Sequence, residues 1–384
     1  MKVLISYTTD GQIAIIKGLI ESLAEGGIDV LAWNRTTHRC FSNNEDVFKS
    51  NISFLSGLKR FPRVIMMLLY HLPFFLSYFT KRGLYNIDVL NFHFHEGLCD
   101  RLITYLRAND TKLIISIWGS DLYRISDKTK EKRQKVYPQV DLIHVESPGV
   151  KKDFLNTYQI DERRVVSCNF GVYLFDNINR LRNDKDSIIE KMLPKEAKDK
   201  IIVTCGYNAR KGQQHAIMIE QLNSLPEAYK KRLFVVFPLT YTVSYDSFLD
   251  EIEDELKDFD IPYYCFREKL PVDDLAKLRI LSDVVINIQI SDALSSSLVE
   301  YFYAGNIMLL GDWLPYEFLK EEYDIHYIPI KISNISEKVR YVVDNYMNEI
   351  EEANNNIEKT YRLSGWPSVS QRFRDIFHEV NKRR

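Results

Sequence analysis

The stretch that most constrains the fold of this chain runs from Asp283 to Asn306. It begins with Asp283–Ile290, a short run dominated by Val and Ile, which is typical of a buried parallel strand. A polar loop with three successive serines, Ser295–Ser297, follows, and then an apolar, aromatic segment that ends at Gly305. Glycine just after the last apolar residue is typical of a helix end. The order strand, polar loop, short helix therefore predicts an α/β fold.

The loop in this stretch is a candidate anion site. Free N–H groups and the positive end of the helix dipole would both point into it, so we expect Ser295, Ser296 and Ser297 to surround a bound anion. A carboxylate stands at each end, Asp292 and Glu300, with seven residues between them. A simpler interpretation remains open, in which a serine only caps the helix and Asp292 faces solvent.

The pair of acids followed by Ala304 and Gly305 resembles the E-x7-E motif of retaining glycosyltransferases with the GT-B fold, above all family 4. Asp292 stands where that family usually has Glu, and Glu300 matches. The resemblance implies that Glu300 holds the ribose of a nucleotide sugar and that Asp292 contacts the sugar. It also implies two Rossmann-like α/β domains facing a cleft, with a C-terminal helix that crosses back to the first domain.

Length and composition are consistent with such a protein. The 384 residues suggest about two domains, and 45% hydrophobic residues are enough for large cores. The formal net charge of −2 gives no reason to expect nucleic acid as a partner. The five cysteines are scattered without a C-x-x-C pair, which favours reduced thiols in the cytoplasm and argues against structural zinc.

The first residues predict a βαβ unit, with a strand at Lys2–Ser6, a loop containing Gly11 and Gln12, and a helix at Ile13–Glu25. The loop lacks G-x-G-x-x-G, so no nicotinamide cofactor is expected, and we expect no other cofactor. In the resembling family the corresponding loop lies over the donor diphosphate, which implies that role for Gly11 and Gln12.

Two later strands end in residues that suit a ligand site. The strands are expected at 87–95 and 112–118, and the carboxyl ends of parallel strands are where doubly wound folds bind ligands. These ends resemble the family's "D-V-V-H-x-H" and "H-G-x-D", with Trp118 in the place of the second motif's histidine. We predict that His95, Trp118 and Asp121 line the acceptor or sugar pocket, and that Trp118 stacks on a sugar, which a deoxy sugar would favour. A buried structural role for His95 is the alternative.

The segment 59–82 has an apolar, aromatic centre with basic residues at both ends. Its uninterrupted apolar part is too short to span a bilayer. Such a segment can lie in a membrane interface, or it can form an ordinary buried helix pair, and both interpretations remain open. The resemblance implies docking near a lipid-linked acceptor at the inner face of the cell membrane.

The second half carries the expected donor loop. Arg210 and Lys211 lie beside Gly212 on a loop that opens a helix, so they could clamp a diphosphate, although a basic turn without a ligand is the alternative. Lys211-Gly212 matches the family loop, and Arg210 would replace its arginine. Asp258 and Asp260 spell D-x-D, but they stand between a helix and a strand, which favours a helix-end turn over a metal site. We expect domains at 1–175 with 364–384 and at 200–363, joined by a linker at 176–199.

Together these features predict a metal-independent glycosyltransferase that moves a hexosyl or deoxyhexosyl unit from a nucleotide sugar to a glycan acceptor. The resemblance implies retention of configuration and a lipid-linked acceptor in bacterial surface polysaccharide synthesis. A short stretch at 237–241 also resembles bacterial fucosamine-type transferases. Two alternatives remain: a GT-B sugar-nucleotide 2-epimerase, and a noncatalytic partner of a transferase.

Overall fold

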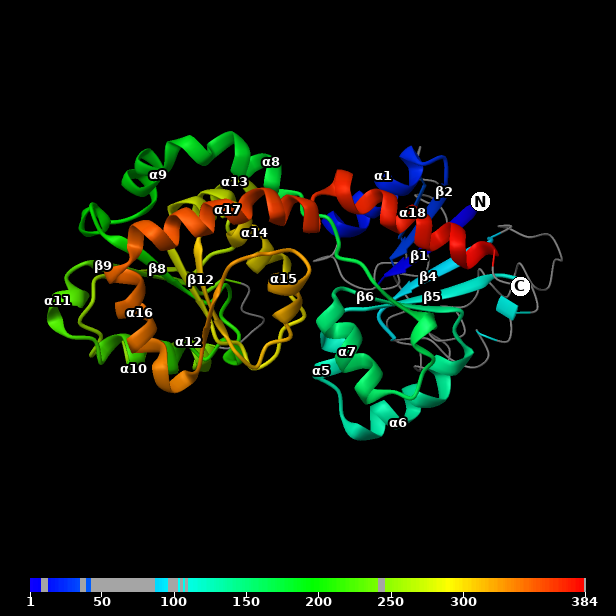
Figure 1. Ribbon diagram of the computed structural model, residues 1–384, viewed down its shortest axis with the longest axis horizontal. Coiled ribbons are helices and arrows are strands. Elements are labelled where there is room, and N and C mark those ends of the chain that lie inside the picture. Colours follow the sequence, from blue (N-terminus) through cyan, green and yellow to red (C-terminus); the bar gives the residue numbers. More distant parts are fainter. Residues whose placement is uncertain are drawn as a thin grey trace. The chain divides into compact units, whose positions relative to one another are not determined.

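The computed structural model describes residues 1–7, 13–34, 39–42, 87–95, 103, 106–107, 110–240 and 246–382. Gly11, Gln12 and the segment 59–82 lie outside these residues. The chain divides into two compact units, Met1–Gly171 with Trp366–Arg384, and Val172–Gly365. Each unit is a sheet covered by helices (Figure 1), which confirms the predicted α/β fold. Among the described residues, no helix has the length and apolar character needed to cross a membrane.

The first unit is built on a seven-stranded sheet in the order β3-β2-β1-β4-β5-β6-β7. Its strands are β1 (Lys2–Tyr7), β2 (Asp29–Asn34), β3 (Arg39–Ser42), β4 (Val89–His93), β5 (Lys112–Ile117), β6 (Leu142–Val145) and β7 (Val165–Ser167). All neighbours are parallel except β3, which runs antiparallel to β2 at the edge. Its described helices include α1 (Ile13–Glu25), α5 (Ser120–Tyr123), α6 (Asp127–Val136), α7 (Pro148–Thr157) and α18 (Trp366–Lys382). The alternation of parallel strands and helices is the arrangement that the βαβ pattern predicts.

The last helix, α18, belongs to the first unit although it lies at the end of the chain. It packs against α1, and its buried side chains recur every three or four residues along one face. These are Val369, Phe373, Phe377 and Val380, which join the same core as β1 and α1. The predicted C-terminal helix that returns to the first domain is therefore confirmed.

The second unit has a six-stranded, fully parallel sheet in the order β10-β9-β8-β11-β12-β13. Its strands are β8 (Ile201–Cys205), β9 (Leu233–Pro238), β10 (Tyr263–Phe266), β11 (Val284–Asn287), β12 (Ile307–Gly311) and β13 (Ile328–Ile330). Its helices are α8 (Leu174–Leu181), α9 (Lys185–Met192), α10 (His215–Asn223), α11 (Glu227–Lys230), α12 (Asp246–Leu256), α13 (Val272–Leu281), α14 (Ser296–Ala304), α15 (Glu317–Glu321), α16 (Ile335–Asp344) and α17 (Tyr346–Ser364). From β8 the chain proceeds outward to β9 and β10, and from β11 it proceeds outward to β12 and β13. The strand order therefore reverses between β8 and β11, which is where such sheets bind ligands.

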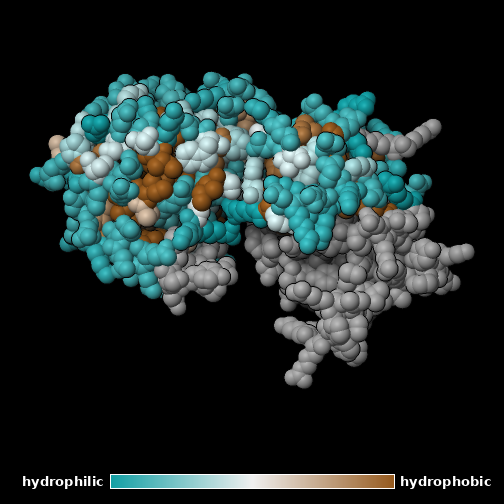
Figure 2. All heavy atoms as spheres, turned by 90° about the horizontal axis from the view of Figure 1, so that it is seen from below, coloured by the Kyte–Doolittle hydropathy of each residue, from teal (hydrophilic) through white to brown (hydrophobic). Residues whose placement is uncertain are grey.

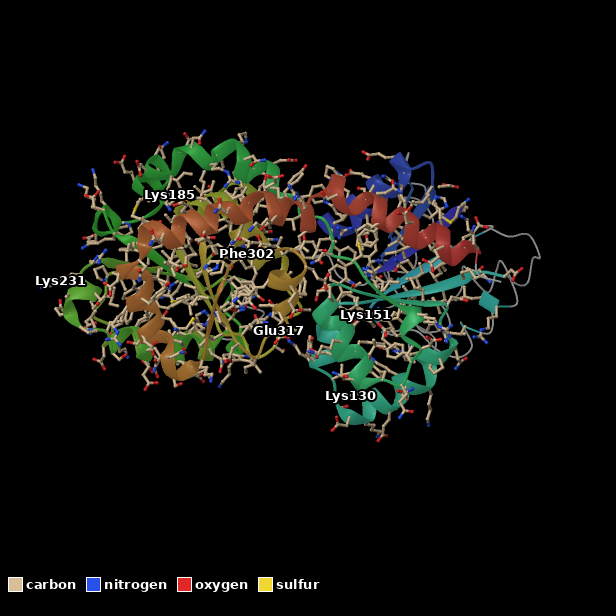
Figure 3. The ribbon with its side chains drawn as sticks, viewed as in Figure 1. Lys130, Lys151, Lys185, Lys231, Phe302 and Glu317 are labelled. Carbon is tan, nitrogen blue, oxygen red and sulfur yellow. The ribbon has the colours of Figure 1, made fainter. Side chains whose placement is uncertain are left out.

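Strand alternation gives the second sheet two apolar faces. In β11, Val285 packs into one core, while Val284 and Ile286 pack into the other. Phe302 of α14 lies inside the first of these cores, whereas Lys231 lies at the surface (Figure 3). Hydrophilic residues cover most of the visible surface in Figure 2, and apolar residues reach it in a patch on the second unit, at the left.

The interval 176–199, expected to be a linker, is mostly helical and belongs to the second unit. Helices α8 and α9 bury Phe175, Ile178 and Ile188 in its core. The polar composition hid this role because the apolar residues recur only every three or four positions, as on a surface helix. Such a helix gains its stability from the elements it packs against, here α13 and α14, rather than from its own sequence.

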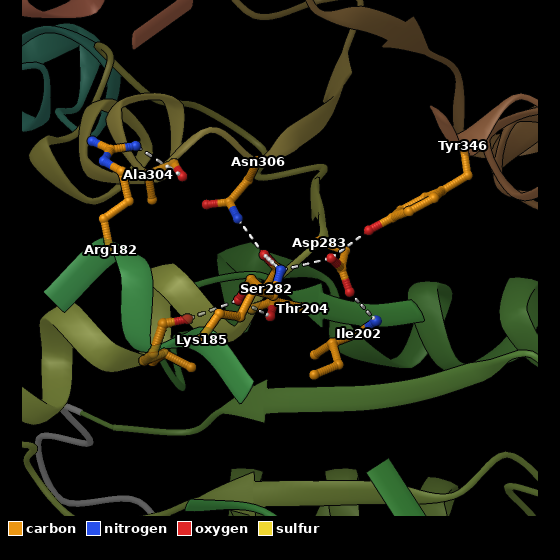
Figure 4. A network of polar contacts seen from close by, with 10 residues as sticks. Arg182, Lys185, Ile202, Thr204, Ser282, Asp283, Ala304, Asn306 and Tyr346 are labelled. Atoms are coloured by element: carbon orange, nitrogen blue, oxygen red, sulfur yellow. Dashed lines mark hydrogen bonds and ion pairs between the residues drawn. The ribbon is translucent and has the colours of Figure 1, made fainter. Parts of the chain in front are cut away.

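A buried carboxylate joins α9 and α17 to the sheet, at the edge away from the strands' carboxyl ends. Asp283, just before β11, accepts hydrogen bonds from the Ile202 amide at 2.8 Å, the Lys185 ammonium at 2.7 Å and the Tyr346 hydroxyl at 2.6 Å (Figure 4). These partners come from β8, α9 and α17. Burial and the neighbouring Asp283 carboxylate both raise the pKa of Tyr346, so its hydroxyl remains a donor.

In the first unit, a buried polar chain crosses three strands. Ser116 donates to the side chain of Asn91 at 3.0 Å, and His144 lies 3.1 Å from the Ser116 hydroxyl. The other ring nitrogen of His144 is 2.8 Å from the Cys168 carbonyl, which can only accept, so that nitrogen carries the proton. Burial lowers the pKa of His144 from 6.5 to about 4.

This shift predicts an acid-sensitive first unit. His144 is neutral when folded and takes up a proton on unfolding, so its contribution is complete above pH 6.5 and is lost as the pH falls toward 4. Between pH 7 and pH 5 we expect it to lower the free energy of unfolding by about 2 kcal/mol. His144→Gln should remove that part of the pH dependence in urea unfolding, while His378→Gln, on the exposed face of α18, should leave it unchanged. An unchanged slope in His144→Gln would contradict the assignment.

Candidate functional site

Two loops meet at the carboxyl ends of β8 and β11, where the strand order reverses. The Gly206 amide donates to the Ile286 carbonyl at 2.9 Å, and the Ile290 amide donates to the Gly212 carbonyl at 3.0 Å. The Gln214 side chain also donates to the Ile288 carbonyl. The cationic loop and the loop that leads to the serines, predicted from distant parts of the sequence, thus lie side by side.

A glutamine joins these loops through its side chain. The side-chain oxygen of Gln289, Oε1, accepts from the Tyr207 hydroxyl at 2.7 Å and from the side-chain amide of Gln213. Its own amide donates to the Ser291 carbonyl at 2.6 Å. Gln213 and Gln289 are both buried. Because a buried amide must keep its hydrogen bonds, this arrangement holds the two loops in one conformation.

The two cations of the first loop reach solvent. Arg210 and Lys211 are both exposed, and the Lys211 ammonium lies 3.5 Å from Glu251 in an exposed ion pair. Such a pair contributes little stability, so Lys211 can exchange it for a ligand at small cost. The Arg210 amide donates to the Asn208 side chain at 3.0 Å, which fixes the backbone at the start of the turn.

The serine loop presents the amino end of α14. Ser295 is the N-cap residue, yet its side chain makes no capping hydrogen bond, so the first turn keeps its free N–H groups. Ser296 and Ser297 form that turn and are partly exposed. Asn287, at the end of β11, is fully buried, and neither polar atom of its side chain has a partner among the described residues. Backbone N–H groups without a hydrogen-bond partner at the start of a helix favour the binding of an anion.

Asp292 is turned inward. Its carboxylate accepts from the Tyr316 hydroxyl at 2.6 Å and from the Ser295 amide at 3.2 Å. Burial raises the pKa of Asp292, and these hydrogen bonds oppose that rise. The side chain therefore anchors the loop that carries Tyr316, and the sugar contact that the resemblance implies stays a prediction.

Glu300 forms a buried ion pair with Arg279 of α13. Two nitrogens of Arg279 donate to the same carboxylate oxygen, Oε2, at 3.1 and 3.0 Å, and the guanidinium lies 4.1 Å from the centre of the Tyr301 ring. Burial raises the pKa of Glu300, while Arg279 opposes the rise. Since both bonds go to Oε2, the other oxygen keeps its capacity to accept from a ligand hydroxyl.

The first-unit candidates lie among aromatic rings. Trp118 donates to His93 at 3.0 Å and lies nearly parallel to Phe94 and Phe170, with ring centres 5.5 and 4.7 Å away. Trp118 thus already stacks on two phenyl rings, and its contact with a sugar stays a prediction. Burial, together with the nearby positive charge of Arg133, lowers the pKa of His95 to about 4, so its ring is neutral at pH 7.

Asp121 is also engaged within the protein. Its carboxylate accepts from the Trp118 amide at 3.3 Å and lies 3.7 Å from the buried guanidinium of Arg133. Arg133 also donates to the Asp121 carbonyl. The predicted cluster of His95, Trp118 and Asp121 is thus brought together at the ends of β4 and β5, and Asp121 is held as the partner of an arginine.

The arginines of both ion pairs were missed from the sequence. Arg133 stands in a run of charges on α6, which predicts a solvated face. Arg279 gave a better signal, because it is a single cation among Leu278, Ile280 and Leu281 just before a buried strand. A lone charge inside an apolar run indicates a buried partner, since an unpaired buried charge is very costly.

Comparison with known proteins identifies the fold. No sequence model of a protein family matches the chain, and no curated protein matches it. Among solved structures, a glycosyltransferase from Rickettsia africae ESF-5 is similar with a TM-score of 0.73 and 14% identity, over 100% of this chain and 99% of the other. The chain has the GT-B fold. Sucrose-phosphate synthase from Thermosynechococcus elongatus is similar with a TM-score of 0.72 and 12% identity, covering 99% of each chain. Anabaena Alr3699/HepE in complex with UDP and glucose gives 0.67 and 11%, covering 99% of this chain and 100% of its own.

The buried ion pair predicts a strong coupling between two side chains. Arg279→Met leaves the Glu300 carboxylate buried without a cation and should lower the free energy of unfolding by about 3–5 kcal/mol. Adding Glu300→Gln removes the stranded charge, so the double variant should be more stable than Arg279→Met alone.

The control is Arg180→Met, which breaks the exposed pair with Asp273. It should cost less than about 1 kcal/mol. Urea unfolding of the wild type, Arg279→Met, Glu300→Gln and the double variant measures the coupling. Additive effects of the two substitutions at the buried pair would show that Arg279 and Glu300 do not interact as described.

Proposed function

We propose that the protein is a glycosyltransferase that takes a sugar from a nucleoside-diphosphate sugar. One observation carries the proposal: the cationic loop at 206–214 is hydrogen-bonded to the loop that ends at the amino end of α14, at the point where the strand order reverses. Cations on one loop and free helix N–H groups on the other are complementary to a diphosphate. The GT-B fold supports the same class of reaction, although fold alone does not decide function.

In the proposed reaction, the diphosphate is the leaving group. Negative charge grows on it as the bond to the sugar breaks, and Arg210, Lys211 and the N–H groups of Ser296 and Ser297 stabilise that charge. The free oxygen of Glu300 accepts from the ribose hydroxyls, with Arg279 orienting the carboxylate. These groups would replace a metal ion, so we propose metal-independent transfer.

The finer proposal follows the family resemblance. It assigns transfer with retention to a lipid-linked acceptor during bacterial surface polysaccharide synthesis, with segment 59–82 near the membrane. The first donor to test is UDP-glucose, because HepE, which has a similar fold, is known in complex with it.

A donor panel tests the proposed activity. The protein is incubated with UDP-glucose, GDP-fucose and dTDP-rhamnose, with and without an undecaprenyl-diphosphate-linked sugar as acceptor. We expect release of one nucleoside diphosphate that increases with acceptor and does not need added Mg²⁺. Isomerisation of a donor without transfer would replace the proposal with an epimerase, and absence of nucleotide binding would favour a noncatalytic partner.

Lys211 offers a sharper test of the diphosphate site. Lys211→Ala should weaken binding of the preferred nucleoside diphosphate about tenfold or more, because a charge-assisted contact is lost. The matched control is Lys231→Ala, since Lys231 is similarly exposed and also has one exposed ion pair, at the end of α11. Calorimetric titration measures both variants. Equal affinities for the two would place the diphosphate elsewhere.

A further inference from the structure

Trp313 lies in the loop between β12 and α15, and its side chain is 40% exposed. Its indole N–H donates to the Gln289 carbonyl at 3.0 Å. Gln289 is the residue whose side chain joins the two ligand loops. A large aromatic ring is thus fixed at the edge of the candidate donor site while much of it remains open to solvent.

The neighbouring glycine explains how the ring is oriented. A Cβ atom on Gly311 would lie 2.7 Å from Cζ2 of Trp313 and 2.9 Å from both Cε2 and Cη2. Near-equal distances to three adjacent ring atoms mean that Gly311 lies against the face of the six-membered ring. One face of the indole therefore rests on the end of β12, and its exposure belongs to the opposite face and the edge.

Ile290, the residue after Gln289, is a second exposed apolar residue. Its side chain is 64% exposed, and its backbone is hydrogen-bonded to Gly212, next to Lys211. Meanwhile Asp292 is occupied by Tyr316, three residues beyond Trp313. The exposed side chains beside the proposed diphosphate site thus include an indole and an isoleucine, while the nearby carboxylate is turned inward.

We propose that Trp313, with Ile290, recognises the sugar of the donor by stacking on its C–H face. This inference rests on the proposed function. Aromatic rings favour flat apolar surfaces, and removal of such a surface from water is favourable. The site should therefore prefer neutral hexoses and deoxyhexoses over a uronic acid, whose carboxylate would lose hydration beside an apolar wall.

The test compares nucleotides with and without their sugar. Calorimetry measures binding of UDP and UDP-glucose, GDP and GDP-fucose, and dTDP and dTDP-rhamnose to the wild type, Trp313→Ala and Trp313→Phe. For the preferred donor, we expect Trp313→Ala to lose about tenfold in affinity for the nucleotide sugar while the free nucleotide changes less than twofold. Trp313→Phe, which keeps an aromatic face, should retain most of the affinity.

Two further variants separate stacking from structure. Gly311→Ala leaves the indole in the protein but forces it to move, so it should also weaken only the sugar-bearing ligand. Tyr341→Ala removes an aromatic ring of similar exposure on α16 and should change neither affinity. If Trp313→Ala loses the same affinity for the nucleotide and for the nucleotide sugar, or loses affinity for neither, the inference about Trp313 is wrong. The proposed function is unaffected by that result. Failure of all six ligands to bind the wild type rejects the proposed function, and the inference with it.

Discussion

The loops at the carboxyl ends of three strands in the second unit are held together by one buried amide. Gln289 stands two residues beyond the end of β11, where the chain has left the sheet and its polar groups have lost their strand partners. Its side chain accepts from Tyr207 and Gln213 of the β8 loop and donates to Ser291 of its own loop, while its carbonyl accepts from Trp313. Three loops from three adjacent strands are thus held through one residue, and such preorganisation is what a diphosphate site requires.

Buried ion pairs fix the orientation of side chains in both units. Each unit holds an arginine and a carboxylate in a buried pair, Arg133 with Asp121 and Arg279 with Glu300. Such pairs add little net stability, because desolvation offsets their attraction. Their value lies in orientation: a carboxylate fixed at one oxygen presents the other in a defined direction. In Glu300 both arginine bonds converge on Oε2, so Oε1 is the oxygen left to accept from another group.

Local sequence signals predicted the strands at Lys2–Ser6, 87–95, 112–118 and 283–290 and the two loops that lie side by side, because each depends on periodicity or on a glycine near the element itself. The returning helix was implied by the family resemblance. Local signals could not predict that α8 and α9 belong to the second core, since those helices pack against α13 and α14, which lie far along the chain. Arg133 and Arg279 were missed for a related reason, as a pair's partner lies on another element. The inward turn of Asp292 depends on Tyr316, a partner supplied by the loop after β12.

Trp118 and Asp292, which we expect to contact the sugar, both make contacts within the protein. Trp118 is held among His93, Phe94 and Phe170, and Asp292 is bound by Tyr316. Neither set of contacts disturbs the junction of the loops, because that junction relies on backbone amides and on Gln289. The side chains that join the loops are therefore different from the two that resemble the family's sugar contacts, so either set can change without the other. Under the proposed function, the joined loops hold the diphosphate, and the sugar meets the exposed side chains of Trp313 and Ile290 rather than the buried carboxylate of Asp292.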